Sequence, residues 1–159
     1  DDKLGKYKFE PIYDIKVVQN EMKSDKAILV FVDDFIGTGH TAEKCFQSVN
    51  LLDNILNRTM VLALVAQEEG VKCIESFGIK VYSGEVRKKG ITDYYDVKEA
   101  KEKMILMEEI EEKMAIKKEY RFGYGASEAL VTMCRTPNNT FPVFWEEKGN
   151  MKLAPFPRG

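Results

Sequence analysis

The sequence predicts an α/β fold built on an open parallel sheet. The continuous apolar run at 27–32 is typical of a strand that is buried on both faces, as in parallel sheets. Segments with strand and helix patterns then alternate as far as residue 85, an order typical of right-handed crossover units. A length of 159 residues suits one domain, so we expect a single domain over 1–159.

The elements of this sheet region follow from local patterns. Residues 1–25 are mixed and charged, and Pro11 should interrupt any early helix. The first strand ends at two aspartates. Beyond them, apolar residues at helical spacing predict a helix over 41–57. The remaining expected elements are a strand at 59–66, a short helix at 68–78 closed by Gly78, and a strand at 79–85.

The second half of the chain opens with a long, highly charged helix, expected within 96–118. Its apolar stripe consists of Val97, Ala100, Met104, Met107, Ile110 and Met114. The favoured interpretation is packing on the domain, and a surface for a protein partner or a second copy is the alternative. The last segment, 120–159, should add further strands, one at 128–134 and another within the loop that follows.

Composition narrows the function classes. The net charge of −2 excludes a broad field that would attract nucleic acid, although 24 Lys and Arg leave a local basic patch open. Three scattered cysteines form no metal-binding spacing, which favours reduced thiols and a cytoplasmic protein. No stretch is long and apolar enough to span a membrane, and no signal peptide is visible.

The candidate site lies where the first strand ends, at the carboxyl edge of the sheet. Gly37 and Gly39 let the backbone approach a ligand, and the helix that follows offers free N–H groups to a phosphate. The adjacent carboxylates of Asp33 and Asp34 would repel a phosphate, but they suit sugar hydroxyls or Mg²⁺. The pattern therefore predicts a sugar-phosphate site.

Two other interpretations of this strand fit less well. A Walker B strand of a nucleoside triphosphatase requires a G-x-x-x-x-G-K-[ST] loop, which the sequence lacks. An aspartate of the response-regulator or phosphatase kind would leave the Gly/Thr-rich loop unexplained.

Residues 29–42, "LVFVDDFIGTGHTA", resemble the phosphoribosyl-pyrophosphate (PRPP) motif of type I phosphoribosyltransferases, and 62–83 are similar to the strand–helix–strand that follows it. The likeness covers roughly 27–84. It implies that Asp33 and Asp34 hold the ribose hydroxyls and stabilise an oxocarbenium-like transition state. It also implies that the loop wraps the 5-phosphate, and that Mg²⁺ is carried on the pyrophosphate and the ribose hydroxyls. The loop residues concerned are Gly37, Thr38, Gly39, His40 and Thr41.

The chain departs from this family at two points. Purine-salvage members carry an aspartate base at the position of Gly37, so activation of a purine in that way is not expected here. For His40, the only histidine, donation to a phosphate is favoured over catalysis. Far fewer residues precede the motif than in the transferases. We therefore expect either a fold incomplete at its N-terminus within a longer protein, or a reduced fold without activity.

The tail carries a second resemblance. Its Gly-rich turn, its T-P-N-N-T-F-P segment at 136–142 and its P-F-P-R end at 155–158 are similar to phosphoribosyltransferase-like proteins of bacterial conflict and antiphage systems, some of them beside retron reverse transcriptases. That likeness implies a defence effector, and a catalytically inactive module that senses PRPP or a nucleotide is the alternative. Asn138 and Asn139 either form a turn or contact a base, and Arg158 either binds a phosphate or ends in solvent.

Overall fold

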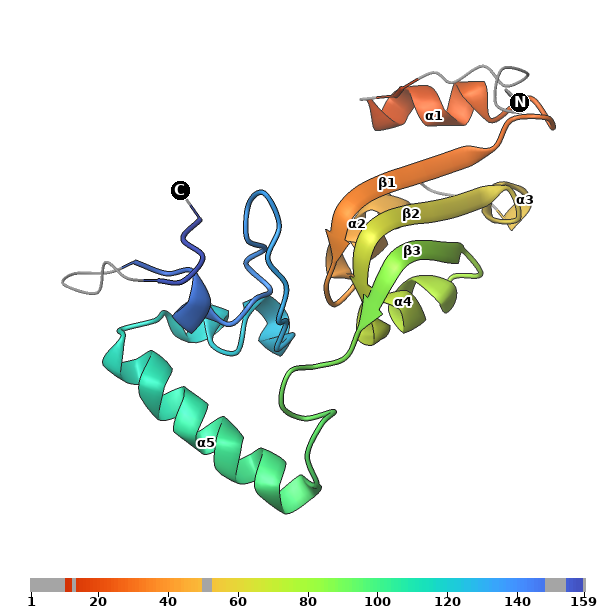
Figure 1. The fold of residues 1–159 in the computed structure, drawn as a ribbon. Helices are drawn as coiled ribbons and strands as arrows, with labels where there is room; N and C mark the ends of the chain where they lie inside the picture. The colour runs from red at the N-terminus through yellow and green to blue at the C-terminus, as the bar shows by residue number, and fades with distance from the viewer. Residues whose placement is uncertain (1–10, 13, 50–52, 148–153, 159) are drawn as a thin grey trace, which may run out of the picture.

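A computed structural model describes residues 11–12, 14–49, 53–147 and 154–158 (Figure 1). The chain forms two regions that lie side by side. One is a sheet with its helices, and the other is a long helix with the C-terminal segment, joined to the first by an extended connector (Figure 1).

In the described part of the chain, three parallel strands form the sheet in the order β1-β2-β3, which confirms the predicted α/β class. They are β1 (Leu29–Ile36), β2 (Thr59–Gln67) and β3 (Lys80–Arg87). The main correction concerns β1, which continues through both aspartates, whereas the sequence placed its end before them. Asp33 pairs in register with Ala63, so the central strand fixes the backbone that carries the first carboxylate.

Among the described residues, four helices accompany the sheet: α1 (Ile15–Glu21), α2 (His40–Val49), α3 (Asp53–Leu56) and α4 (Glu68–Glu75). The predicted helix over 41–57 is thus two helices in the structure, and residues 50–52 lie outside the described residues. Helix α1 begins four residues after Pro11, which the sequence predicted would interrupt an early helix. Gly78, with φ +78°, follows α4 as predicted for a residue that ends a helix.

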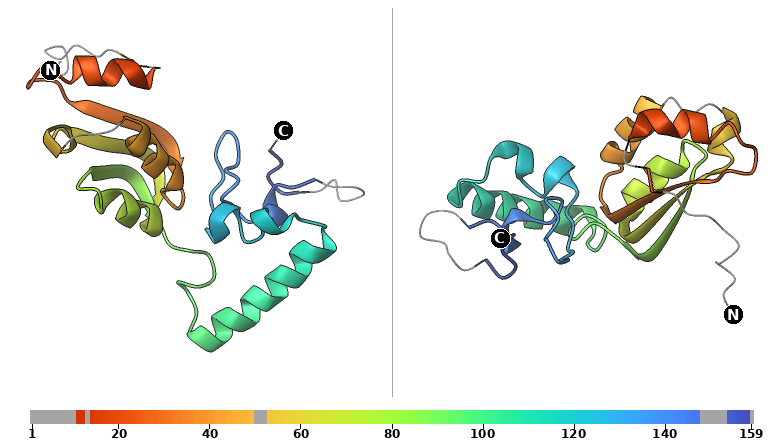
Figure 2. Two further views of the ribbon diagram at one scale, coloured as in Figure 1. Left: turned by 180° about the vertical axis from the view of Figure 1, so that it is seen from behind. Right: turned by 90° about the horizontal axis from the view of Figure 1, so that it is seen from above.

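The core of the sheet region lies on the face that these helices cover (Figure 2). Phe46 of α2 is its centre, with its ring centroid 5.2 Å from that of Phe31 in β1 and 5.9 Å from that of Phe77 after α4. Helix α1 extends this core, because Val18 and Met22 pack with Leu29.

The opposite face of the sheet is exposed among the described residues, which corrects the expectation of strands buried on both faces. Val32 is 78% exposed and Leu64 is 64% exposed, and Tyr82 on β3 is also exposed. The physical reason is that the covering helices lie together on one face. An apolar run in the sequence shows that a strand is hydrophobic, but it does not show which face of the sheet other elements will bury.

The long helix α5 (Val97–Lys113) is shorter than the predicted span of 96–118. Asp96 caps its start by accepting a hydrogen bond from the N–H of Glu99 at 2.9 Å. The helix ends before Ala115, whose φ of +54° is incompatible with a right-handed helix.

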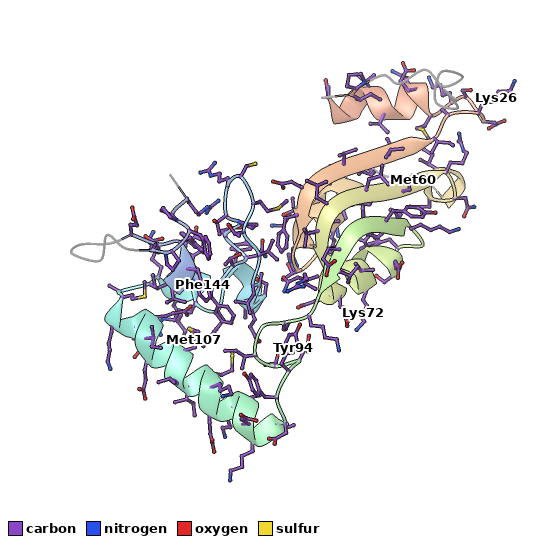
Figure 3. All side chains as sticks on the ribbon, viewed as in Figure 1. Lys26, Met60, Lys72, Tyr94, Met107 and Phe144 are labelled. Atoms are coloured by element: carbon purple, nitrogen blue, oxygen red, sulfur yellow. The ribbon has the colours of Figure 1, made fainter. Side chains whose placement is uncertain are left out.

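The apolar stripe of α5 packs within the protein, as the favoured interpretation predicted. Met104 and Met107 contact the cluster of Ile91, Ala100 and Phe141, which Phe144 also joins (Figure 3). Val97 does not belong to this stripe, because it is 89% exposed.

The C-terminal segment contains no strand among its described residues, contrary to the prediction for 128–134 and for the loop after it. A single bridge joins Ala129 to Thr140. Short 3₁₀ turns occur instead at η2 (Lys118–Tyr120), η3 (Tyr124–Ala126) and η4 (Pro142–Phe144). Positive φ angles at Phe122, Ala126 and Glu128 prevent a continuous extended backbone.

Polar side chains connect this segment to the rest of the fold. The buried Glu128 carboxylate accepts hydrogen bonds from the N–H groups of Ile91 and Thr92, at 3.0 and 2.8 Å, and from the Thr92 hydroxyl at 3.0 Å. At the end of β2, the buried Gln67 amide donates to the carbonyl oxygen of Ser127 at 2.8 Å. No helix in the described part of the chain is long and apolar enough to cross a membrane.

A buried carboxyl near the end of α5 makes stability depend on pH. Glu111 is fully buried and accepts a hydrogen bond from the N–H of Phe122 at 2.8 Å. Burial raises the pKa of Glu111 to about 6 and Glu108 adds to the rise, while the N–H of Phe122 and the charge of Arg121 oppose it. The folded state therefore holds this proton more tightly than the unfolded state does.

We expect the contribution of Glu111 to stability to be complete below pH 4.5 and to be lost as pH rises through 6, a change of about 2 kcal/mol. Glu111→Gln should remove this slope, because glutamine is neutral throughout and can still accept the bond from Phe122. Urea unfolding at pH 4.5, 6 and 7.5 measures the effect, with Glu109→Gln on the exposed side of α5 as the control. Equal slopes in wild type and Glu111→Gln would contradict the prediction.

Candidate functional site

A cavity of about 500 Å³ lies at the carboxyl end of β1, between the loop that follows β1 and the C-terminal segment. Two stretches that are far apart in the sequence line it, 33–42 and 135–139, together with Tyr124 and Arg158. The structure thus brings together every residue that the sequence predicted for the site. They are Asp33, Asp34, Gly37, Thr38, Gly39, His40, Thr41, Asn138 and Asn139.

The two aspartates form the acidic part of the cavity. Asp33 Oδ1 accepts a hydrogen bond from the N–H of Asp34 at 2.9 Å, which fixes the first carboxylate against the backbone. Burial raises the pKa of Asp33 and the neighbouring Asp34 carboxylate adds to the rise, while the N–H groups of Asp34 and Phe35 oppose it. Such a pair binds hydrogen-bond donors or a cation and repels anions.

The donor set allows a test of the expected Mg²⁺. No group of three or more His, Cys, Asp and Glu side chains that could hold a metal occurs among the described residues. Mg²⁺ commonly binds through only one or two carboxylates, with substrate phosphates and water as its other ligands. Asp33 and Asp34 fit that arrangement, in which the ligand carries most of the coordination.

The N-terminus of α2 forms the part of the cavity that suits an anion. The first hydrogen bond of the helix runs from the N–H of Glu43 to the carbonyl oxygen of Gly39 at 2.9 Å. The N–H groups of His40, Thr41 and Ala42 therefore have no acceptor within the helix, and all three residues line the cavity. Free N–H groups at a helix N-terminus bind phosphate and carboxylate groups.

The loop before α2 packs against α4 on one side and against Asn139 of the C-terminal segment on the other. Both contacts are so close that they require glycine. A Cβ atom at Gly37 would collide with the side-chain amide of Asn139, and one at Gly70 in α4 would collide with the carbonyl oxygen of Gly37. At Gly39, where φ is +85°, a Cβ atom would lie 2.8 Å from that of Cys73. The course of the loop is therefore fixed from both sides.

The C-terminal segment supplies the facing wall. Asn139 Nδ2 donates to the carbonyl oxygen of Tyr124 and to the hydroxyl of Ser127, both at 3.3 Å. The N–H of Tyr124 donates to the carbonyl oxygen of Asn138 at 2.8 Å. These bonds give Asn139 a structural role, because they join the T-P-N-N turn to the segment around Tyr124 and Ser127. The side chain of Asn138 lines the cavity.

Three lining side chains outside the predicted site residues can contact a ligand through a ring or a charge: Tyr124, Arg135 and Arg158. Tyr124 is 41% exposed, so its ring can stack on a planar ligand group. The sequence pattern does not point to Arg135, and for Arg158 it fits both a phosphate contact and an end in solvent. Arg135 directly precedes the T-P-N-N turn and Arg158 lies in the P-F-P-R end, but neither position shows from the sequence alone which loop the side chain faces.

Comparison with protein-family models gives one finding: the model described as PRTase-CE, a phosphoribosyltransferase-like family, matches residues 2–158. The comparison with curated proteins gives no match.

Proposed function

Because the chain belongs to the PRTase-CE family, we propose that its cavity binds PRPP, or a related ribose phosphate or nucleotide, together with Mg²⁺. One observation carries this proposal. A pair of carboxylates and the free N-terminus of a helix face the same cavity, so sugar hydroxyls and a phosphate can be held at once.

The roles of the residues follow from their chemistry. The 5-phosphate would accept hydrogen bonds from the N–H groups at His40, Thr41 and Ala42. The ribose hydroxyls would donate to Asp33 and Asp34, whose negative charge would also stabilise a positive charge developing at the anomeric carbon. Mg²⁺ would neutralise negative charge on the pyrophosphate.

Binding without turnover is the second candidate. The purine-salvage members of the type I phosphoribosyltransferases, from which this chain departs here, use an aspartate at the position of Gly37. Here the side chain of Asn139 fills the space that any side chain at Gly37 would need. Such a module would sense PRPP or a nucleotide with the same residues. We include in the same proposal a role within a longer bacterial defence protein in the cytoplasm. Its support is the resemblance of residues 136–142 and 155–158 to proteins of bacterial antiphage systems.

Calorimetric titration of PRPP with Mg²⁺ tests the proposal, and we expect saturable binding. Asp34→Asn should weaken binding 10- to 100-fold, because it removes the charge from hydrogen bonds worth about 1.5–3 kcal/mol. Asp25→Asn, an exposed site outside the cavity, is the matched control and should leave affinity unchanged.

Two results would count against the proposal: no heat of binding from folded wild type, or equal affinities for wild type and Asp34→Asn. Release of pyrophosphate during incubation separates an enzyme from a binding module.

A further inference from the structure

Arg135 and Arg158 both line the cavity, and both come from the C-terminal segment. Every ion pair recorded for the described residues involves other side chains. The cavity therefore contains two guanidinium groups without a described carboxylate partner, in addition to the free N–H groups of α2.

Arg158 is held in place by packing and is not fully satisfied by hydrogen bonds. Its guanidinium carbon lies 5.1 Å from the ring centroid of Trp145, and the indole of Trp145 is fixed by donation to the carbonyl oxygen of Thr140 at 2.7 Å. The Nε atom of Arg158 is buried and has no hydrogen-bond partner among the described residues. An unsatisfied buried donor is costly, so it indicates a missing acceptor.

Hydrogen bonds connect the two backbone segments that carry the arginines. The hydroxyl of Thr136, next to Arg135, donates to the carbonyl oxygen of Phe156 at 3.1 Å. The N–H of Phe156 donates to the carbonyl oxygen of Phe144 at 2.8 Å. These bonds join the backbone beside Arg135 to the backbone that leads to Arg158.

We propose that Arg135 and Arg158 form a second anion subsite, so that the cavity selects a ribose phosphate with a second phosphate or pyrophosphate group. This inference rests on the proposed function, because it assigns the first phosphate to α2 and the ribose to Asp33 and Asp34. Guanidinium groups suit this role, because their planar N–H donors match phosphate oxygens in pairs. The carboxylates repel anions, which keeps the two anionic groups at separate positions.

Titration of two ligands tests the subsite. PRPP carries both anionic groups, and ribose 5-phosphate carries only the first. With Mg²⁺ present, Arg135→Gln and Arg158→Gln should each weaken PRPP binding tenfold or more, and should change ribose 5-phosphate binding by less than twofold. Arg87→Gln, at the end of β3 and outside the cavity lining, is the control and should change neither affinity.

Inorganic pyrophosphate without Mg²⁺ provides a probe that does not need the ribose. Wild type should bind it at least tenfold more tightly than the Arg135→Gln/Arg158→Gln double variant. If this difference holds but PRPP does not bind, the proposed function fails and the anion subsite stands. If Asp34→Asn weakens PRPP binding but the arginine variants do not, the proposed function stands and the subsite is overturned.

Arg158→Lys tests the contribution of the paired N–H donors, because lysine keeps the positive charge but lacks these donors. It should bind PRPP with an affinity between those of wild type and Arg158→Gln. Equal loss of affinity for PRPP and ribose 5-phosphate in the arginine variants would indicate a structural role only, and would overturn the proposal.

Discussion

Replacement of Gly123 by alanine is expected to lower the free energy of unfolding by about 3 kcal/mol. Gly123 has φ +80° and ψ +161°, a conformation that is essentially restricted to glycine. A Cβ atom there would also collide with the carbonyl oxygen of Asn139. That oxygen cannot move freely, because it accepts hydrogen bonds from the hydroxyl of Ser127 at 2.8 Å and the N–H of Ala129 at 3.2 Å.

Gly78→Ala is the matched control, since Gly78 has a similar φ of +78° but no atom within 4 Å of the position that a Cβ atom would take. It should cost about 1 kcal/mol, from backbone strain alone. Urea unfolding followed by the fluorescence of Trp145, the only tryptophan, reports directly on the C-terminal segment. Equal costs for the two substitutions would show that the Asn139 carbonyl yields easily, contrary to the prediction.

The second large effect is expected at Gly37. Gly37→Ala should reduce stability by about 2 kcal/mol, because its methyl group must displace the side chain of Asn139. Displacement breaks the bonds from Asn139 to Tyr124 and Ser127, which join the facing wall to the loop. PRPP binding should weaken at least tenfold as well, since both walls of the cavity shift. Unfolding and calorimetry measure the two effects.

A double-mutant cycle identifies the contact responsible. Asn139→Ala removes the atoms with which the new methyl group collides, so Gly37→Ala should cost little in that background. The stability of the double variant should be close to that of Asn139→Ala alone, giving a coupling of at least about 1 kcal/mol. Additive costs would mean that Gly37→Ala acts through the backbone and not through Asn139.

These contacts explain why the C-terminal segment matters for the proposed function. The sheet region offers the N-terminus of α2 and two carboxylates, and these groups line the cavity together with 135–139 and Arg158. The close approach of Gly37 to Asn139 holds that arrangement, and the Thr136–Phe156 bond positions the arginines within it.

The sequence by itself determined the features that depend on neighbouring residues. The alternation of apolar strands with amphipathic helices predicted the three parallel strands, and β2 and β3 lie close to their expected positions. Gly78 predicted the end of α4, because a left-handed residue after a helix favours glycine. Asp33 and Asp34, followed by the Gly/Thr loop, predicted where a site would lie.

Only the tertiary structure decided the features that depend on distant residues. It left one face of the sheet without a helical cover in the described part of the chain, although the strands are apolar on both faces. It gave 128–134 an irregular path, in which Glu128 has a positive φ and the carbonyl oxygen of Val131 accepts a hydrogen bond from the hydroxyl of Thr140 and not from a strand partner. It also set Asn139 against Gly37, and Arg135 and Arg158 into the same cavity. No local pattern encodes these contacts, because each depends on how segments that are distant in the sequence pack together.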